Sequence, residues 1–219
     1  MAYIGGSVAF GLNKDLSDKD YVGVYAARPL ALHLDLYSSV PETLTASVDG
    51  GDDYVLHEAL KFGRLLLKGN PGIIEALFYD GDGYRSEAWE ALQRHREAFL
   101  SQKVVHHYLG FVNSQIKQFN ANKGKSTKKL YHVIRLLGEV ERICAGSAPA
   151  IRITGLERDR LMSIRAGNES ADDILAEADT RIAAILAAEP WGLPARADED
   201  VVMAWLLDIR RGKYDSAPA

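Results

Sequence analysis

The spacing of apolar residues changes once along the chain, and this change constrains the fold more than any other feature of the sequence. Before about residue 56, short runs such as Tyr21–Tyr25 and Leu30–Leu34 alternate in a way that is typical of β-strands. From Leu56 onward, apolar residues recur every three or four positions, which is typical of helices. The sequence therefore predicts an α/β segment first and a mostly helical segment after it, with a boundary near the turn Tyr79–Gly83.

Several residues indicate where helices begin and end. Gly69, Asn70 and Pro71 end one helix and start the next, because glycine suits the left-handed position after a helix and proline suits the first turn. Further helices are expected after residues that commonly precede a helix. These residues are Ser86, Ser101, Thr127, Ser170 and Asp198.

The overall composition excludes several classes of protein. With 30 acidic and 26 basic residues, the chain has a net charge of -4, so it lacks the global positive field that holds duplex DNA non-specifically. The single cysteine, Cys144, excludes an internal disulfide and a cysteine-cluster metal site. No window approaches the roughly 18 apolar residues of a membrane span, and no targeting segment is recognisable. We therefore expect a cytoplasmic protein with no membrane partner.

Two carboxylates stand at the start of an expected strand. Asp18 and Asp20 are two residues apart, so both side chains are expected to project from the same face of that strand. Two like charges this close repel each other unless a cation lies between them. Mg²⁺ prefers carboxylate oxygens together with substrate phosphates, and the pair therefore predicts a Mg²⁺ site.

A glycine and a serine upstream form a candidate phosphate cradle. Gly6 lets backbone N–H groups approach phosphate oxygens, and Ser7 adds a hydroxyl donor at the start of an expected helix, whose dipole favours anions. A phosphate cradle beside a metal site suits nucleotidyl transfer, which depends on metal ions and alignment more than on covalent help. The alternative interpretation is that Gly6 serves a tight turn and that Asp18–Asp20 is a charged loop tip.

These residues resemble the signature of the polymerase beta-like nucleotidyltransferases, in which a Gly-Ser pair is followed, after a spacer, by Asp-x-Asp in a strand. More narrowly, the chain resembles the RNA-ligase-adjacent polymerase-beta-like proteins of RNA repair clusters, over roughly residues 3 to 170. The motifs that carry this resemblance are Gly6-Ser7-x-Ala9-Phe10-Gly11, Ser17-Asp18-x-Asp20-x-x-Gly23-Val24-Tyr25, Lys61-Phe62, Leu67-Lys68-Gly69-Asn70-Pro71, Glu75-Ala76-Leu77-Phe78, Tyr108-x-Gly110-Phe111-x-x-Ser114-Gln115 and Lys129-x-Tyr131-His132-x-x-Arg135-Leu136-Leu137.

The resemblance implies an α+β fold with a polymerase beta-like mixed sheet. We expect a nucleotidyltransferase catalytic domain over residues 1–80, a mainly α-helical domain over 81–212 that completes the nucleotide site, and a flexible tail over 213–219. Relatives have a longer segment before the Gly-Ser pair, so we expect support for the first strand from elsewhere in the molecule or from upstream residues.

The resemblance also implies a reaction. Two Mg²⁺ ions, with Mn²⁺ able to replace them, would assist the transfer of a nucleoside monophosphate from an NTP such as ATP, with release of pyrophosphate. The expected acceptor is a hydroxyl group at an RNA end or another polynucleotide end. Two alternatives stay open: nucleotidylation (AMP transfer) of a protein or small molecule, and a non-catalytic module that binds NTP for regulation.

The family's catalytic residues can be assigned to positions in this sequence. The resemblance makes Asp18 and Asp20 the shared metal ligands and makes Gly6 and Ser7 the residues that hold the triphosphate. A third carboxylate on a neighbouring strand would complete the metal site, and we expect Asp53 in this role because it opens a segment just before the Lys61–Phe62 helix. The alternatives for the third carboxylate are Asp52, Glu58 and Asp35.

The helical part contributes further expected nucleotide contacts. These are Lys68, Ser114, Gln115, Lys129, His132 and Arg135. The first of them fits a solvated helix edge equally well, whereas Ser114 and Gln115 interrupt an apolar pattern and resemble a nucleotide-contacting pair. Lys129, His132 and Arg135 are spaced by three, so they share one helix face. Such a cationic face would suit a triphosphate or an RNA end, although lysines near a connector more often belong to a solvated loop.

Overall fold

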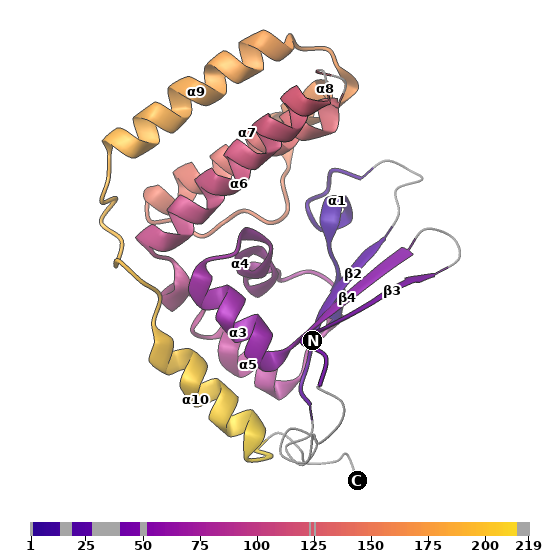
Figure 1. The fold of residues 1–219 in the computed structure, drawn as a ribbon, viewed down its shortest axis with the longest axis vertical. Helices are drawn as coiled ribbons and strands as arrows, with labels where there is room; N and C mark the ends of the chain where they lie inside the picture. Colours follow the sequence, from indigo (N-terminus) through magenta and orange to yellow (C-terminus); the bar gives the residue numbers. More distant parts are fainter. Residues whose placement is uncertain are drawn as a thin grey trace.

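The computed structural model describes residues 2–13, 19–27, 40–48, 52–122, 124 and 126–213. Within these ranges the chain has the predicted α+β fold, with a mixed sheet beside a larger helical part (Figure 1). Asp18, Asp35, the run Leu30–Leu34 and the tail after Lys213 lie outside the described residues.

The described part of the chain forms one five-stranded sheet with the order β3-β4-β2-β1-β5. The strands are β1 (Ala2–Ile4), β2 (Asp20–Tyr25), β3 (Thr43–Val48), β4 (Asp52–Glu58) and β5 (Gly83–Tyr84). β2 and β4 are parallel, whereas the other neighbouring pairs are antiparallel. The predicted start of helical structure at Leu56 is wrong, because Leu56 pairs with Gly23 and with Leu44 inside the sheet.

Helices make up most of the remaining described chain. They are α1 (Gly6–Ala9), α3 (Ala59–Lys68), α4 (Pro71–Phe78), α5 (Glu87–Gln93), α6 (Gln102–Ala121), α7 (Thr127–Cys144), α8 (Gly155–Ala166), α9 (Ala171–Ala187), α10 (Glu199–Arg210) and a 3₁₀ turn (Arg96–Phe99). The predicted starts after Ser86, Ser101, Ser170 and Asp198 are confirmed, whereas α7 begins one residue earlier than expected, after Ser126.

Helix α8 was not predicted, because its sequence is dominated by charge. It buries only Leu161 and Ile164 completely, so its apolar periodicity is weak. None of the helices within the described ranges is both long and apolar enough to cross a lipid bilayer.

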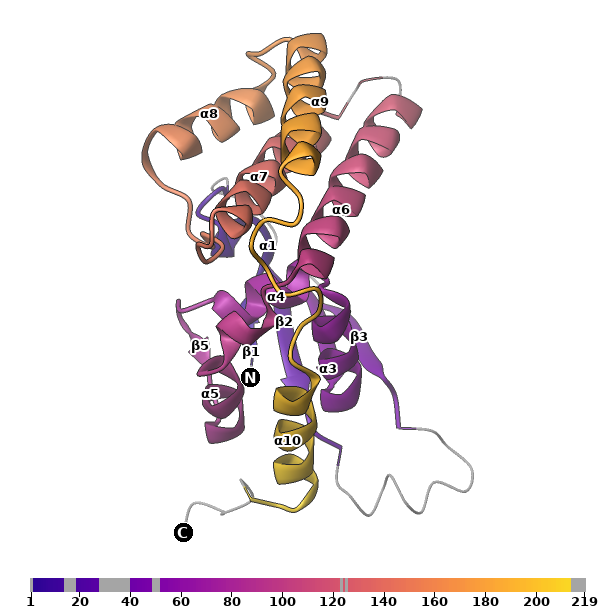
Figure 2. The ribbon, with the colours of Figure 1, turned by 90° about the vertical axis from the view of Figure 1, so that its left-hand side faces the viewer.

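The longer helices form two groups, one of α6, α7, α8 and α9 and the other of α3, α4, α5 and α10. α6 and α7 run side by side, and α7 also contacts α8 and α9 (Figure 1). α10 packs against α3 and α5, and Figure 2 shows these three helices below α6 and α7. A Cβ at Gly63 would lie 2.7 Å from Val202 Cγ1, so α3 and α10 meet closely there. Trp89 and Trp205 are buried core residues.

The turn between α3 and α4 has the predicted structure. Gly69 ends α3 with a left-handed backbone (φ 76°), the side chain of Asn70 accepts a hydrogen bond from Ile73 N, and Pro71 is the first residue of α4. A Cβ at Gly69 would lie only 2.8 Å from Val104 Cα, at the start of α6. Glycine at this position therefore sets both the direction of the chain and the approach of α6 to α3.

We predict that Gly69→Ala lowers the free energy of unfolding by at least about 1–2 kcal/mol, because it adds left-handed strain and a contact with backbone. The matched control is Gly110→Ala on α6, where an added Cβ meets nothing within 4 Å. This control is expected to raise stability by up to about 1 kcal/mol through helix propensity. Urea denaturation of both variants measures the difference, and equal stabilities would contradict the prediction.

Candidate functional site

The turn between β1 and α1 lies directly against the first residue of β2. Gly5 N–H donates a hydrogen bond to the carbonyl oxygen of Asp20 at 2.6 Å. Gly6 has a positive φ of 59°, and a Cβ on it would lie 2.1 Å from Asp20 Oδ2. A residue with a side chain would therefore collide with this carboxylate. The structure thus brings Gly6 and Asp20, two of the predicted site residues, into contact.

Asp53 lies beside Asp20 on the neighbouring strand. The two residues are paired in the parallel register of β2 and β4, so their side chains project from the same face of the sheet. Asp53 N–H donates to Lys19 O at 3.1 Å, and Asp53 Oδ1 accepts a hydrogen bond from Ser47 Oγ at 2.6 Å. Ser47 was not predicted, because its position opposite Asp53 depends on the register of β3.

The alternatives for the third carboxylate differ in what the structure shows. Glu58 is buried, caps α3 through Leu60 N and forms an ion pair with Arg210 at 2.6 Å. Its carboxylate therefore already binds Leu60 N on α3 and Arg210 on α10. Asp52 is the first residue of β4, and Asp35 lies outside the described residues.

The donor set at this end of the sheet fits a magnesium-type cation. Asp20 and Asp53 are exposed carboxylates in adjacent register positions, and oxygen ligands are those that Mg²⁺ prefers. Within the described ranges, no group of three or more His, Cys, Asp or Glu residues is placed to hold a metal ion. Asp18, the other half of the predicted pair, lies outside those ranges.

The C-terminal helical region holds the segment that follows α1. Three donors bind three consecutive carbonyl oxygens of this segment. They are Ile153 N to Phe10 O at 3.1 Å, Arg158 Nε to Gly11 O at 2.8 Å and Arg165 Nη1 to Leu12 O. Sequence analysis missed these arginines because nothing local relates α8 to residues about 150 positions earlier. α8 therefore holds Gly11 and Leu12, which follow the candidate phosphate cradle.

Tyr131 on α7 lies within electrostatic reach of Asp20. Tyr131 is buried, and the guanidinium of Arg165 lies 5.3 Å from its ring centroid. Burial raises the pKa of Tyr131, the positive charges of Arg165 and Arg135 oppose this rise, and the negative charge of Asp20 adds to it. The sequence analysis gave Tyr131 no role.

His132 and Lys129 lie on the same turn of α7. Burial, followed by the positive charges of Arg135 and nearby lysines, lowers the pKa of His132 to about 3. The imidazole is consequently neutral at neutral pH, and its ring stacks on Tyr131 with centroids 4.2 Å apart. Lys129 is partly buried. Its ammonium group supplies a positive charge at this turn, whereas the imidazole of His132 is neutral.

We predict that His132 makes the protein sensitive to acid. Because its pKa in the folded protein lies below the ordinary value of 6.5, the unfolded chain binds the proton first, and stability is lost as pH falls from about 6.5 toward 3. His132→Gln should therefore lose less stability than the wild-type protein between about pH 7.5 and about pH 4.5. Urea denaturation at both pH values measures this, and parallel losses in the two proteins would contradict it.

Arg135 is buried where α7, α4 and the end of α1 meet. Its Nη1 forms an ion pair with Glu75 Oε1 at 2.8 Å, and its Cζ lies 3.9 Å from the centroid of the Phe10 ring. Arg135 Nε has no hydrogen-bond partner among the described residues. The guanidinium thus links three elements, and a contact between Arg135 and nucleotide stays a prediction.

We predict that Arg135→Met destabilises the fold by about 3–5 kcal/mol, because it leaves the carboxylate of Glu75 buried without its partner. The double variant Glu75→Gln/Arg135→Met removes both charges and should be less destabilised than Arg135→Met alone. Chemical denaturation of both variants tests this, and simple additivity of the two single substitutions would contradict it.

The other three predicted nucleotide contacts, Lys68, Ser114 and Gln115, lie on α3 and α6. Lys68 is exposed at the end of α3, and its charge reaches His107 on α6. Ser114 is exposed and accepts a hydrogen bond from Gln118 Nε2 at 3.1 Å, whereas Gln115 Oε1 is buried without a partner among the described residues. No hydrogen bond or ion pair within the described chain joins these three residues to Asp20. Their predicted role as nucleotide contacts stays a prediction.

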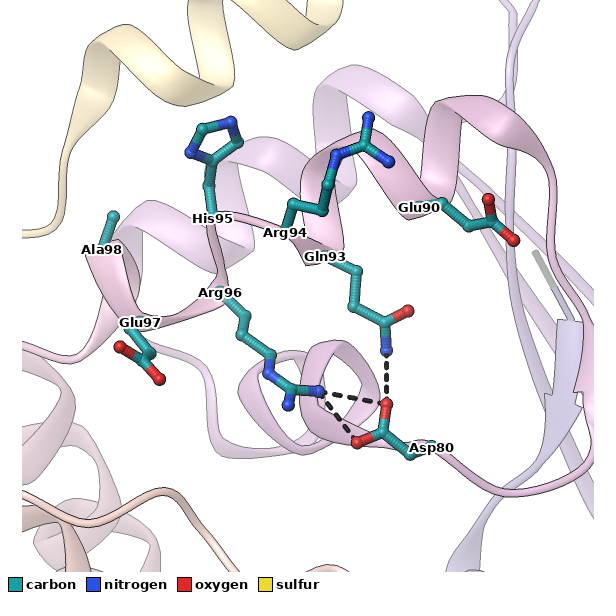
Figure 3. A pocket seen from close by; sticks show the side chains of 8 residues that line it. All are labelled: Asp80, Glu90, Gln93, Arg94, His95, Arg96, Glu97 and Ala98. Carbon is teal, nitrogen blue, oxygen red and sulfur yellow. Dashed lines mark hydrogen bonds and ion pairs between the residues drawn. The ribbon is translucent and has the colours of Figure 1, made fainter.

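A separate pocket lies at the end of α5, on elements that carry none of the predicted site residues (Figure 3). Three of its polar side chains bind one another: Arg96 Nη1 contacts both carboxylate oxygens of Asp80, at 3.0 and 2.9 Å, and Gln93 Nε2 contacts Asp80 Oδ1 at 3.2 Å. Figure 3 shows these three side chains turned toward one another. The candidate site is therefore the carboxylate end of the sheet rather than this pocket.

Comparison with family models identifies the family of this chain. The model of the RNA repair pathway DNA polymerase beta family matches residues 1–201 of this chain. The chain belongs to this family. The description of this family refers to an RNA repair pathway and to DNA polymerase beta.

One relative is an uncharacterized protein of Methanocaldococcus jannaschii. It is 30% identical over 133 residues, which are 60% of this chain and 54% of that protein. The match thus spans about half the length of that relative. Comparison with solved structures found no match.

Proposed function

We propose that this chain is a metal-dependent nucleotidyltransferase that transfers a nucleoside monophosphate from an NTP to a hydroxyl group at an RNA end or another polynucleotide end. The observation that carries the proposal is the contact of the Gly6 turn with Asp20, next to Asp53 in the parallel register. A phosphate-binding turn beside paired carboxylates is the arrangement that nucleotidyl transfer needs. Membership in an RNA repair family supports the choice of acceptor.

In this proposal Asp18, Asp20 and Asp53 hold two Mg²⁺ ions, and Mn²⁺ is able to replace them. Bound metal supplies neutralisation of the charge that develops on the phosphates. Gly6 N–H and the Ser7 hydroxyl bind the triphosphate, and positive side chains such as Lys129 add attraction.

Asp53 is the residue best prepared to take a proton from the acceptor. Its Oδ1 accepts the hydrogen bond from Ser47 Oγ, which holds the carboxylate in one orientation and leaves Oδ2 for the acceptor side. The acceptor hydroxyl gives its proton to this carboxylate as its oxygen bonds to the α-phosphorus, and pyrophosphate leaves with the electrons of the broken bond.

We predict that Asp20→Asn lowers the rate of transfer about a hundredfold or more, because a metal ligand contributes several kcal/mol at the transition state. Gly6→Ala should cause a similar loss, since its Cβ would displace the Asp20 carboxylate. The matched control is Asp179→Asn, which changes an exposed carboxylate on α9 and should keep wild-type activity.

The measurement uses NTP labelled at the α-phosphate, incubated with Mg²⁺ and RNA that ends in a 3′ hydroxyl, or with candidate protein acceptors. Label on the RNA end that depends on Asp20 supports the proposal. Label on a protein would instead indicate nucleotidylation of that protein. Tight NTP binding without any transfer would indicate the regulatory alternative.

A further inference from the structure

Two neighbouring helices are free of acidic residues, although the chain as a whole is acidic. Of the helices with eight or more residues in the described ranges, α3 and α6 alone contain no Asp or Glu. The chain has a net charge of -4, so this local absence of acids runs against its composition. α3 and α6 also contact each other, and Figure 2 shows them on the same side of the molecule.

Cations stand on both helices. The end of α3 lies beside the first turn of α6, because a Cβ at Gly69 would lie 2.8 Å from Val104 Cα. Burial lowers the pKa of His107 on α6, and the charges of Lys103 and Lys68 lower it further. Within the described ranges, Lys68, Lys103 and Lys117 form no ion pair, although the charge of Lys68, after those of Lys61 and Arg64, helps to lower the pKa of Glu42. The carboxylates that do pair with these helices are at the edges: Glu42 binds Lys61 and Arg64, and Glu189 binds His106.

The exposed face of α6 combines these cations with an aromatic side chain. Lys103, Gly110, Ser114 and Lys117 are spaced by seven, four and three, so they share one stripe of the helix. At about 1.5 Å per residue this stripe is about 21 Å long, which is enough for several nucleotides. Phe111 stands beside the stripe and is 41% exposed.

We propose that the α3–α6 face, defined by Lys68, Lys103, Gly110, Phe111, Ser114 and Lys117, binds single-stranded RNA. Phosphates lie against the three lysines, and a base stacks on Phe111, as in other proteins that track a single strand with cations and aromatic rings. The proposal rests on the proposed function, because the strand bound here is the one whose end is the acceptor. Charge complementarity and the exposed aromatic ring together favour a nucleic acid over an acidic peptide.

Gly110 offers a sharp test, because a side chain added there meets nothing within 4 Å. Gly110→Glu places a negative charge in the middle of the face, and Gly110→Gln is a control of nearly identical shape. Binding of a fluorescent single-stranded RNA of about 12 nucleotides is measured by anisotropy. We expect the Glu variant to bind about tenfold more weakly than the Gln variant, because it sets like charge against phosphate. Equal affinities would overturn the proposal.

A second test uses the salt dependence of binding. Lys103→Gln/Lys117→Gln removes two phosphate contacts, so the slope of log affinity against log salt should fall by about 1.4. The control Arg94→Gln/Arg211→Gln removes two exposed charges elsewhere and should leave the slope unchanged. Phe111→Ala should weaken binding between about fivefold and a hundredfold through lost stacking. The same slope in both double variants would overturn the proposal.

Two further measurements separate the possible failures. If an oligoglutamate of equal charge competes as well as unlabelled RNA, the face binds any polyanion and its assignment to RNA is overturned. RNA affinity of Asp20→Asn should equal that of the wild-type protein, because this residue lies outside the face. Retained RNA binding without transfer in the wild-type protein contradicts the proposed function alone, whereas transfer with unchanged affinity in Gly110→Glu contradicts this inference alone.

Discussion

The absence of one side chain at Gly6 allows the candidate site to exist. Because position 6 has no Cβ, the carboxylate of Asp20 can reach the first residue of α1, and the Gly5 N–H can bind the carbonyl of the same aspartate. Asp53 N–H in turn binds Lys19 O, so β1, β2 and β4 are joined at the same end of the sheet. A phosphate bound by this turn would therefore be held at a fixed distance from the carboxylates.

The helical part supports this end of the sheet from outside. α8 supplies two arginines to the carbonyl oxygens after α1, and α7 places Tyr131 and Arg135 against the same region. The buried ion pair between Arg135 and Glu75 contributes orientation, because both charges lose water and keep each other as partners. Parts of the chain that are far apart in sequence thus cooperate in positioning a few N-terminal residues.

The sequence predicted the features that depend on local chemistry. The strand at Tyr21–Tyr25, the Gly69–Pro71 turn and most helix starts follow from backbone preference and short-range capping, and the structure confirms them. The family followed from the Gly6–Ser7 pair, the Asp-x-Asp spacing and the motifs around them. The structure also brings Asp20 and Asp53 together on adjacent strands, as the choice of Asp53 requires.

Features that depend on long-range register could not be predicted from the sequence. Ser47 meets Asp53 only because β3 pairs with β4 in one particular alignment, and no local pattern specifies that alignment. The partner of Arg135 was missed for a similar reason, since the spacing on α7 indicates a shared face but not which element covers it. The neutral state of His132 depends on burial and neighbouring cations, which only the folded arrangement determines.

The bonds from α8 to Gly11 and Leu12 also bear on the order in which parts of the protein form during synthesis. Arg158 and Arg165 leave the ribosome about 150 residues after the carbonyl groups that they bind. A nascent chain that ends before α8 has its glycine turn but lacks the donors that hold the segment after it. This end of the sheet is therefore completed late in translation, when most of the helical part has already emerged.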